Sequence, residues 1–214
     1  MKTGVLCLLL AVAATAAASE YQYEPPVPGT YELPVVRAAA DGALLDSAGK
    51  PVNLRELTRG RVTVLSFIYT RCKSAQACPH ATGVLMDLHE LSAKDATLAK
   101  NLRLISMSFD PVHDTPERMR AHSALASERA TAAPWHFLTA RSESDLQPIL
   151  AAYEQAVDRK ENADDPTGPL NHTLRVYLID RHGRIRNIYS SGTLDLRLVL
   201  ADVKTLLLEP HSLR

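Results

Sequence analysis

The sequence predicts an α/β domain built around a central mixed sheet with helices on its faces. The run 61–69 is almost continuously apolar and rich in β-branched and aromatic residues, as a strand covered on both faces is. A second apolar run, 102–109, has the same character, and a segment with helical spacing of leucines separates the two. Because strands that alternate with helices form parallel pairs in a layered sheet, these observations indicate an α/β architecture.

A turn-rich stretch at 46–50 between two apolar segments predicts an N-terminal β-hairpin over 43–54. A buried strand at 61–69 leads to a helix after Pro79, whose apolar spacing continues to Leu98 with Asp95 as its one polar member.

The second half of the chain repeats the alternation. After the strand at 102–109, the sequence Asp114-Thr115-Pro116-Glu117 is typical of a helix start. The remaining expected elements are a strand at 135–138, a helix at 142–153, strands at 173–180 and 185–189, and a helix at 195–208. A terminal hairpin followed by a helix is the thioredoxin-like pattern, so we predict a thioredoxin-like fold.

The chain divides into three parts. Residues 1–18 are predicted to be a cleaved signal peptide, because Lys2 precedes a ten-residue apolar run that ends in small residues. An uncleaved anchor is the alternative, although a membrane span needs about 20 apolar residues. Residues 19–35 contain four prolines and are expected to be an extended tail or linker, and 36–214 the folded domain.

The charge balance excludes one class of partner. Lys plus Arg and Asp plus Glu both number 24, so the formal charge is zero. A nucleic-acid-binding domain normally shows a basic excess or stripe, and neither is present. We therefore expect no nucleic acid as a partner. The short apolar run of the signal peptide, which ends in small residues, predicts a periplasmic product without a membrane anchor.

Two cysteines flank the start of the predicted second helix. Cys78 precedes Pro79, so the helix dipole is expected to lower the pKa of its thiol. Cys72 lies six residues earlier and would face another side of a helix, so a loop must bring the two thiols together. Such a loop could close a disulfide or hold a soft metal ion such as Cu(I).

A histidine near the two cysteines would distinguish a metal site from a simple pair of thiols. His172 follows the polar loop 164–169, which can carry it to the cysteine end of the sheet; the alternative is a surface loop histidine. We do not expect the other histidines to bind a metal. His80 and His89 are expected on a helix surface, His113 and His136 in polar or packing positions, and His182 in a turn. The sequence around His122 and His211 predicts no particular role for either residue.

Three segments in order resemble the Sco/SenC family of copper-binding thioredoxin-fold proteins. They are FIYTRC…CP, SFDPVHDTPE and NHTLRVYLIDRHG, and the resemblance runs from about residue 33 to 208. It implies that Cys72, Cys78 and His172 bind copper, as Cu(I) and also as Cu(II). Asp110 and Asp114 match a family segment near the site; we interpret Asp114 first as a helix cap and second as a residue that supports the site or recognises a partner.

The resemblance also implies a function. The family takes part in building the copper centre of cytochrome c oxidase, so we expect a periplasmic chaperone that delivers copper, and as a second role reducing equivalents. Its partners would be the copper-bearing oxidase subunit or another periplasmic copper acceptor, and a thiol reductant. Two features depart from the family pattern: five residues instead of three separate the cysteines, and no membrane tether is expected.

Two other functions are compatible with a cysteine pair. A thiol–disulfide oxidoreductase or thiol peroxidase would use Cys72 and Cys78 as its redox pair, although a plain disulfide exchanger more often carries Cys-x-x-Cys and needs no His172. An interaction module with a structural disulfide is the third hypothesis. A domain of this size does not need a disulfide, and a short loop contributes little stability.

Overall fold

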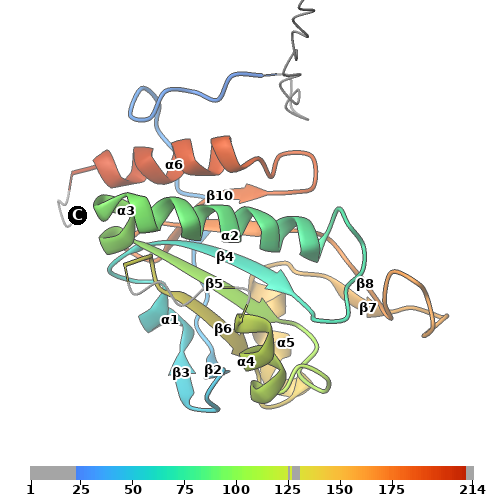
Figure 1. The fold of residues 1–214 in the computed structure, drawn as a ribbon. Coiled ribbons are helices and arrows are strands. Elements are labelled where there is room, and N and C mark those ends of the chain that lie inside the picture. The colour runs from blue at the N-terminus through green and yellow to red at the C-terminus, as the bar shows by residue number, and fades with distance from the viewer. Residues whose placement is uncertain (1–22, 125, 127–130, 211–214) are drawn as a thin grey trace, which may run out of the picture.

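The computed structural model describes residues 23–124, 126 and 131–210. The predicted signal peptide and His211 lie outside the described residues. The main element is an eight-stranded mixed sheet with the strand order β1-β10-β9-β4-β5-β6-β2-β3, and a separate two-stranded sheet pairs β7 with β8 (Figure 1).

The elements have the following bounds. The strands are β1 (Arg37–Ala38), β2 (Ala43–Asp46), β3 (Pro51–Asn53), β4 (Val62–Ile68), β5 (Leu102–Ser108), β6 (Trp135–Thr139), β7 (Val157–Arg159), β8 (Leu170–His172), β9 (Val176–Ile179) and β10 (Arg184–Tyr189). The helices are α1 (Leu54–Leu57), α2 (Cys78–Lys94), α3 (Ala96–Asn101), α4 (Pro116–Ser123), α5 (Glu143–Ala152) and α6 (Leu196–Leu208).

The predicted topology is confirmed. Strands β4, β5 and β6 are parallel, and the β4–β5 register runs from Val62 opposite Leu102 to Ile68 opposite Ser108. The terminal hairpin β9–β10 lies antiparallel to β4, and α6 follows it, as the thioredoxin-like pattern requires. The predicted N-terminal hairpin is formed by β2 and β3.

Two hydrophobic cores cover the two faces of this sheet. Helices α2, α3 and α6 lie over one face, and α4 and α5 lie over the other (Figure 1). Side chains of a strand alternate between faces, so Val62 and Val64 of β4 enter the first core whereas Leu65 and Phe67 enter the second. All of β4 is buried, which explains why its sequence is continuously apolar.

Asp95 ends one helix and begins another. We expected a single helix that reached Leu98, but α2 ends before Asp95 and α3 begins after it. The Asp95 carboxylate accepts hydrogen bonds from the backbone N–H groups of Thr97 at 2.9 Å and Leu98 at 3.2 Å. The one polar residue in the apolar pattern is therefore an N-cap.

Two further expectations are corrected. The N-cap of α4 is Thr115, whose hydroxyl accepts from the Arg118 N–H, and not Asp114. His89 is buried and not on the helix surface, with Nδ1 3.1 Å from the carbonyl oxygen of Ala133.

The segment before the sheet packs against α6. Residues 23–35 contain no helix or strand, as the prolines predicted. The segment is nevertheless no free tail, since the Tyr31 hydroxyl donates to Asp202 at 2.5 Å and the Gly29 N–H to Thr205 at 3.1 Å. Leu33 is buried, and its carbonyl accepts from the Arg186 guanidinium. Ordered packing therefore begins before the predicted boundary at residue 36.

Among residues 23–124, 126 and 131–210, no helix combines the length and the apolarity that crossing a membrane requires.

Candidate metal centre

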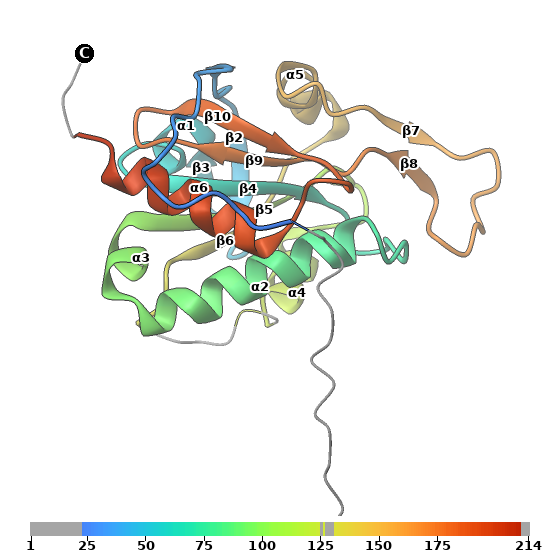
Figure 2. The same cartoon turned by 90° about the horizontal axis from the view of Figure 1, so that it is seen from above.

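Three elements meet at the carboxyl end of β4. This strand ends at Ile68, and the loop 69–77 leads to Cys78, the first residue of α2. Cys72 lies in that loop, and His172 is the last residue of β8 in the hairpin that projects from the domain (Figure 2). Ligand sites in α/β sheets lie at this end of the strands, where loops converge.

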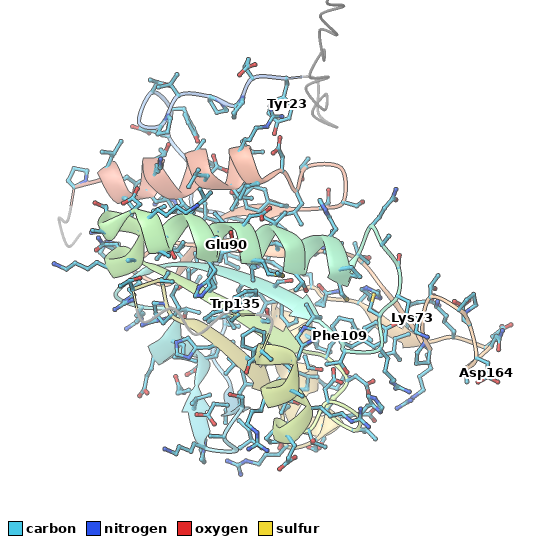
Figure 3. All side chains as sticks on the ribbon, in the orientation of Figure 1. Tyr23, Lys73, Glu90, Phe109, Trp135 and Asp164 are labelled. Atoms are coloured by element: carbon cyan, nitrogen blue, oxygen red, sulfur yellow. The ribbon has the colours of Figure 1, made fainter. Side chains whose placement is uncertain are left out.

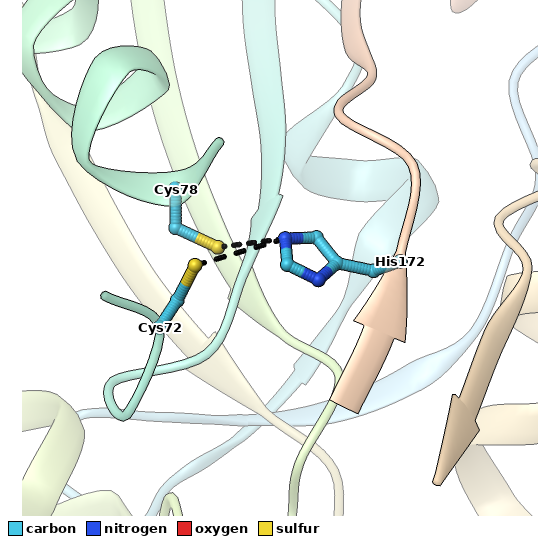
Figure 4. Close-up of side chains that lie close together, drawn as sticks. All are labelled: Cys72, Cys78 and His172. Atoms are coloured by element: carbon cyan, nitrogen blue, oxygen red, sulfur yellow. Dashed lines mark hydrogen bonds between the residues drawn. The ribbon is translucent and has the colours of Figure 1, made fainter. Parts of the chain in front are cut away.

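The three predicted ligands point toward one another (Figure 4). His172 Nε2 lies 3.7 Å from the Sγ of Cys72 and 3.5 Å from the Sγ of Cys78. All three donor atoms lie within 4.8 Å of one another. Since metal bonds to sulfur and imidazole nitrogen are about 2.0–2.3 Å long, donors at this spacing can share one ion.

The donor set fits a soft ion. Thiolates select Cu(I), and imidazole is a ligand that copper also accepts. A structural zinc site almost always has four protein ligands. Among residues 23–124, 126 and 131–210, the cluster of possible metal ligands contains only these three side chains. The geometry therefore suits Cu(I) better than structural zinc.

The imidazole is oriented by its own strand and by two aromatic rings. His172 Nδ1 lies 3.4 Å from the carbonyl oxygen of Leu170, so Nδ1 can keep a proton when Nε2 gives up its hydrogen bond to Cys72 and binds a metal. Tyr69 packs edge-on against the imidazole with ring centroids 5.3 Å apart, and Phe109 lies 5.1 Å away. Burial raises the pKa of Tyr69 to about 12, so its hydroxyl stays protonated.

The two thiols differ in acidity. A hydrogen bond from the Cys78 thiol, followed by one from His172, lowers the pKa of the Cys72 thiol to about 4. The pKa of Cys78 is raised, because its proton is held by the Cys72 thiolate and because its side chain is buried. The expectation that the helix would lower the pKa of Cys78 is therefore wrong: the thiolate forms first on Cys72.

Two buried carboxylates hold the start of the cysteine loop. Asp114 is fully buried and accepts from the Thr70 N–H at 3.0 Å, the Thr70 hydroxyl at 2.5 Å and the Ser108 hydroxyl at 2.6 Å. Asp110 is also buried and accepts from the Arg71 guanidinium at 2.7 Å. Asp114 therefore fixes the residue two positions before Cys72, which is the second role considered for it.

The β7–β8 hairpin is docked on the cysteine loop. The Thr167 carbonyl accepts from the Tyr69 hydroxyl at 3.3 Å and from the Lys73 N–H at 3.1 Å. Gly168 has φ +105°, and a Cβ there would lie 2.8 Å from the Arg71 carbonyl oxygen. Only glycine allows this approach, so Gly168 helps to bring His172 to the cysteines.

Sequence reasoning missed Thr70, Ser108 and Gly168 as supporting residues. A glycine between two prolines in the loop 164–169 was the only signal for any of them. The remaining described histidines stay outside the cluster. The nearest in sequence, His80, places Nε2 2.9 Å from the Leu194 carbonyl oxygen instead.

The fold and the site together define a class of protein: a thioredoxin-like domain in which two cysteines and one histidine are placed to bind one metal ion. Comparison with known proteins resolves the class further. The chain belongs to the SCO1/SenC family, whose model matches residues 37–208. The resemblance inferred from the three sequence segments is thus confirmed.

Individual relatives agree with this assignment. The SCO1 protein homolog of Bacillus subtilis (strain 168) is 29% identical over 146 residues, which are 66% of this chain and 68% of that protein. Bradyrhizobium japonicum ScoI with copper bound shares the fold at 23% identity and a TM-score of 0.63, over 78% of this chain and 98% of that one. BsSco, in which a disulfide switch was identified, is a member of the Sco family of cytochrome c oxidase assembly proteins; it shares the fold at 23% identity and a TM-score of 0.64, over 83% and 99%.

Asp114→Ala should disturb both the fold and the site. It leaves the Thr70 N–H and the Thr70 and Ser108 hydroxyls without their acceptor, and each buried unsatisfied group costs about 1–3 kcal/mol. Residues that orient metal ligands typically contribute about 10–100-fold to affinity, so we expect a Cu(I) affinity lowered by that factor. Thermal unfolding and a Cu(I) competition titration measure the two effects. Asp87→Ala, at an exposed position on α2, is the matched control; unchanged copper affinity in Asp114→Ala would contradict the positioning role.

Proposed function

We propose that the protein binds one copper ion through Cys72, Cys78 and His172 and delivers it for assembly of the copper centre of cytochrome c oxidase. The observation that carries this proposal is the convergence of the three donor atoms within 4.8 Å. Family membership and the copper-bound relative of the same fold support the choice of metal. The description of BsSco supports the oxidase as the destination.

The residues of the chain would hold the ion and also release it. Two thiolates and an imidazole satisfy Cu(I) with three ligands, which leaves room for an incoming ligand from an acceptor. Cys72 is 9% exposed and His172 is half-buried, whereas Cys78 is 4% exposed. We therefore propose that an acceptor approaches from the side of Cys72 and His172, and that Cys78 is the last ligand to dissociate from the copper ion.

The location and partners are part of the same proposal. The N-terminal sequence supports export to the periplasm, where the copper-bearing oxidase subunit or another copper acceptor would receive the ion. An oxidising compartment favours a disulfide between Cys72 and Cys78, so a thiol reductant is needed as a second partner.

A Cu(I) titration of the reduced protein tests the function. A competing chromophoric chelator should report one tightly bound Cu(I) per chain, and copper-loaded protein should lose its ion to the purified copper-bearing domain of the oxidase. Failure to bind Cu(I) in the reduced state would overturn the proposal.

A second function has a specific observation in its favour. The lowered pKa of Cys72 and the neighbouring Cys78 thiol are what thiol–disulfide exchange or peroxide reduction requires. Insulin reduction and peroxide consumption assays distinguish this alternative. Rapid turnover without copper binding would make the protein an oxidoreductase; slow turnover with tight copper binding would leave the chaperone function.

A further inference from the structure

An open hollow lies at the end of the sheet opposite the candidate metal centre. Its volume is about 800 Å³, and its walls come from the last turn of α2, from α3 and from the segments that lead into β4 and β6. Strands β4, β5 and β6 are parallel, so this is the amino end of β4, whereas Cys72 and Cys78 follow its carboxyl end. At about 3.3 Å per residue, the length of β4 separates the two ends by about 20 Å.

The hollow and the metal centre therefore lie in different parts of the molecule. Figure 1 shows α3 at one end and the β7–β8 hairpin at the other. In Figure 3, Trp135, which directly follows the lining residue Pro134, lies to the left of Lys73 and Asp164, which mark the end with the metal centre. A ligand in the hollow would not contact the proposed copper ligands.

The side chains around the hollow carry positive charge. Arg61, Lys94 and Lys100 line it, and none of the three forms an ion pair within the part of the chain that the structure describes. Both lysines are exposed, so a ligand can reach them from solvent. The other described lining residues are alanines, a serine, a threonine and a proline, and none is acidic. Asp95 follows Lys94 in sequence but is not part of the lining, and its carboxylate caps α3.

The positive charge extends beyond the lining. Burial, followed by the charge of Arg61, lowers the pKa of the Arg103 guanidinium. Burial and then the charge of Arg103 lower the pKa of His136, although Asp46 acts in the opposite direction. The sequence shows no basic stripe because these cations stand in separate segments, which the fold brings together at one end of the sheet.

The composition of the lining restricts the class of ligand. Protein–protein interfaces are rich in aromatic residues and poor in lysine, serine and alanine, whereas the described lining has no aromatic residue and many of the latter three. Sites for apolar small molecules and for single-stranded nucleic acids also rely on aromatic side chains. Unpaired cations among small side chains suit a phosphate group, which Arg binds through two parallel hydrogen bonds and Lys binds as a point charge.

We propose that this hollow binds the phosphate groups of an anionic ligand through Arg61, Lys94 and Lys100. Two sources carry such groups: the headgroups of anionic phospholipids and soluble phosphate compounds. The small alanine side chains of the lining let either kind of ligand approach the three cations. The proposal goes beyond the proposed copper function and does not depend on it, because the two sites lie at opposite ends of the sheet.

Two binding measurements test the site and identify the source of the phosphate. In the first, pyrophosphate is titrated into ¹⁵N-labelled, metal-free protein, and saturable NMR shifts should appear at the residues that line the hollow; citrate is the control anion without phosphate. In the second, the protein is sedimented with phosphatidylcholine vesicles, with and without phosphatidylglycerol. Binding that requires phosphatidylglycerol assigns the site to lipid headgroups, and pyrophosphate shifts without vesicle binding assign it to soluble phosphates.

A pair of double variants separates the hollow from general charge effects. Lys94→Gln/Lys100→Gln should weaken the observed binding about tenfold or more, since each Lys or Arg near an anionic group contributes to the attraction. Arg118→Gln/Arg120→Gln makes the same change in net charge at exposed positions of α4, outside the lining, and should bind like the wild type. Equal losses in the two double variants, citrate binding as tight as pyrophosphate binding, or no binding in either measurement would overturn the proposal.

Copper measurements keep this proposal distinct from the proposed function. Lys94→Gln/Lys100→Gln should bind Cu(I) with wild-type affinity, which also shows that this variant is folded. Loss of phosphate binding in this variant with copper binding intact supports the separate site. Failure of the unmodified protein to bind Cu(I) would overturn the proposed function and leave the phosphate site standing.

Discussion

His172→Ala and Cys78→Ser should each lower the Cu(I) affinity of the reduced protein by more than about 100-fold. Each removes one of three donors that lie within 4.8 Å of one another, and the described residues offer no fourth His, Cys, Asp or Glu to replace it. Residues that merely orient a ligand contribute about 10–100-fold, so removing the ligand itself should cost more. A competition titration with a Cu(I) chelator measures the change.

Two histidines outside the cluster serve as controls. His80 lies two residues after Cys78 but binds the Leu194 carbonyl, and His182 lies in the β9–β10 turn. His80→Ala and His182→Ala should keep wild-type Cu(I) affinity. Wild-type affinity in His172→Ala would show that the family role does not extend to this residue.

The parts of the fold that sequence predicts well are those with a strong local pattern. The continuous apolar run of β4 and the leucine spacing of α2 reflect burial, and burial is what the two cores impose. The three ligands were also correctly placed together, because Cys72 and Cys78 follow β4 and the family resemblance singled out His172. Their role as copper ligands remains a prediction for the titrations to test.

Other features depend on contacts between distant segments. Asp114 stands in a typical helix-start sequence, but only the approach of Thr70, 44 residues away, shows what its carboxylate does. The short strands β7 and β8 have no apolar alternation long enough to be recognised, and only the structure shows that their hairpin docks through Thr167 on the cysteine loop. The packing of Tyr31 on Asp202 spans 171 residues and likewise leaves no local signal.

The order in which the two thiols ionise is another feature that the sequence alone does not predict. The position of Cys78 at the start of α2 suggested a thiolate there, through the helix dipole. The nearby Cys72 sulfur and the burial of Cys78 outweigh that effect, because a second negative charge beside an existing thiolate is disfavoured. Such an outcome depends on distances that spacing along the chain does not give.

The five-residue cysteine loop is anchored in the structure despite its length. The Lys73 N–H donates to the Thr167 carbonyl, and the Ala77 N–H to the Ser74 carbonyl at 3.0 Å. Between these anchors, Ala75 and Gln76 are exposed. Deleting Ala75 and Gln76 restores the three-residue family spacing while keeping both Cys72 and Cys78. This variant should still bind one Cu(I), and more tightly if ordering the longer loop costs the wild type about 1–2 kcal/mol per residue.

Oxidation should abolish copper loading in the wild-type protein. The two sulfur atoms already lie within 4.8 Å of each other, so the loop needs only a small movement to form a disulfide. A disulfide removes both thiolates and leaves His172 as the single donor, since the thiolate is the form of cysteine that binds a metal. We expect no measurable Cu(I) uptake by the oxidised protein and full recovery after reduction and removal of the reductant. Titrating oxidised, reduced and loop-shortened proteins side by side measures this. Equal uptake by the oxidised and reduced forms would contradict the redox control, because copper would then be bound without the Cys72 and Cys78 thiolates.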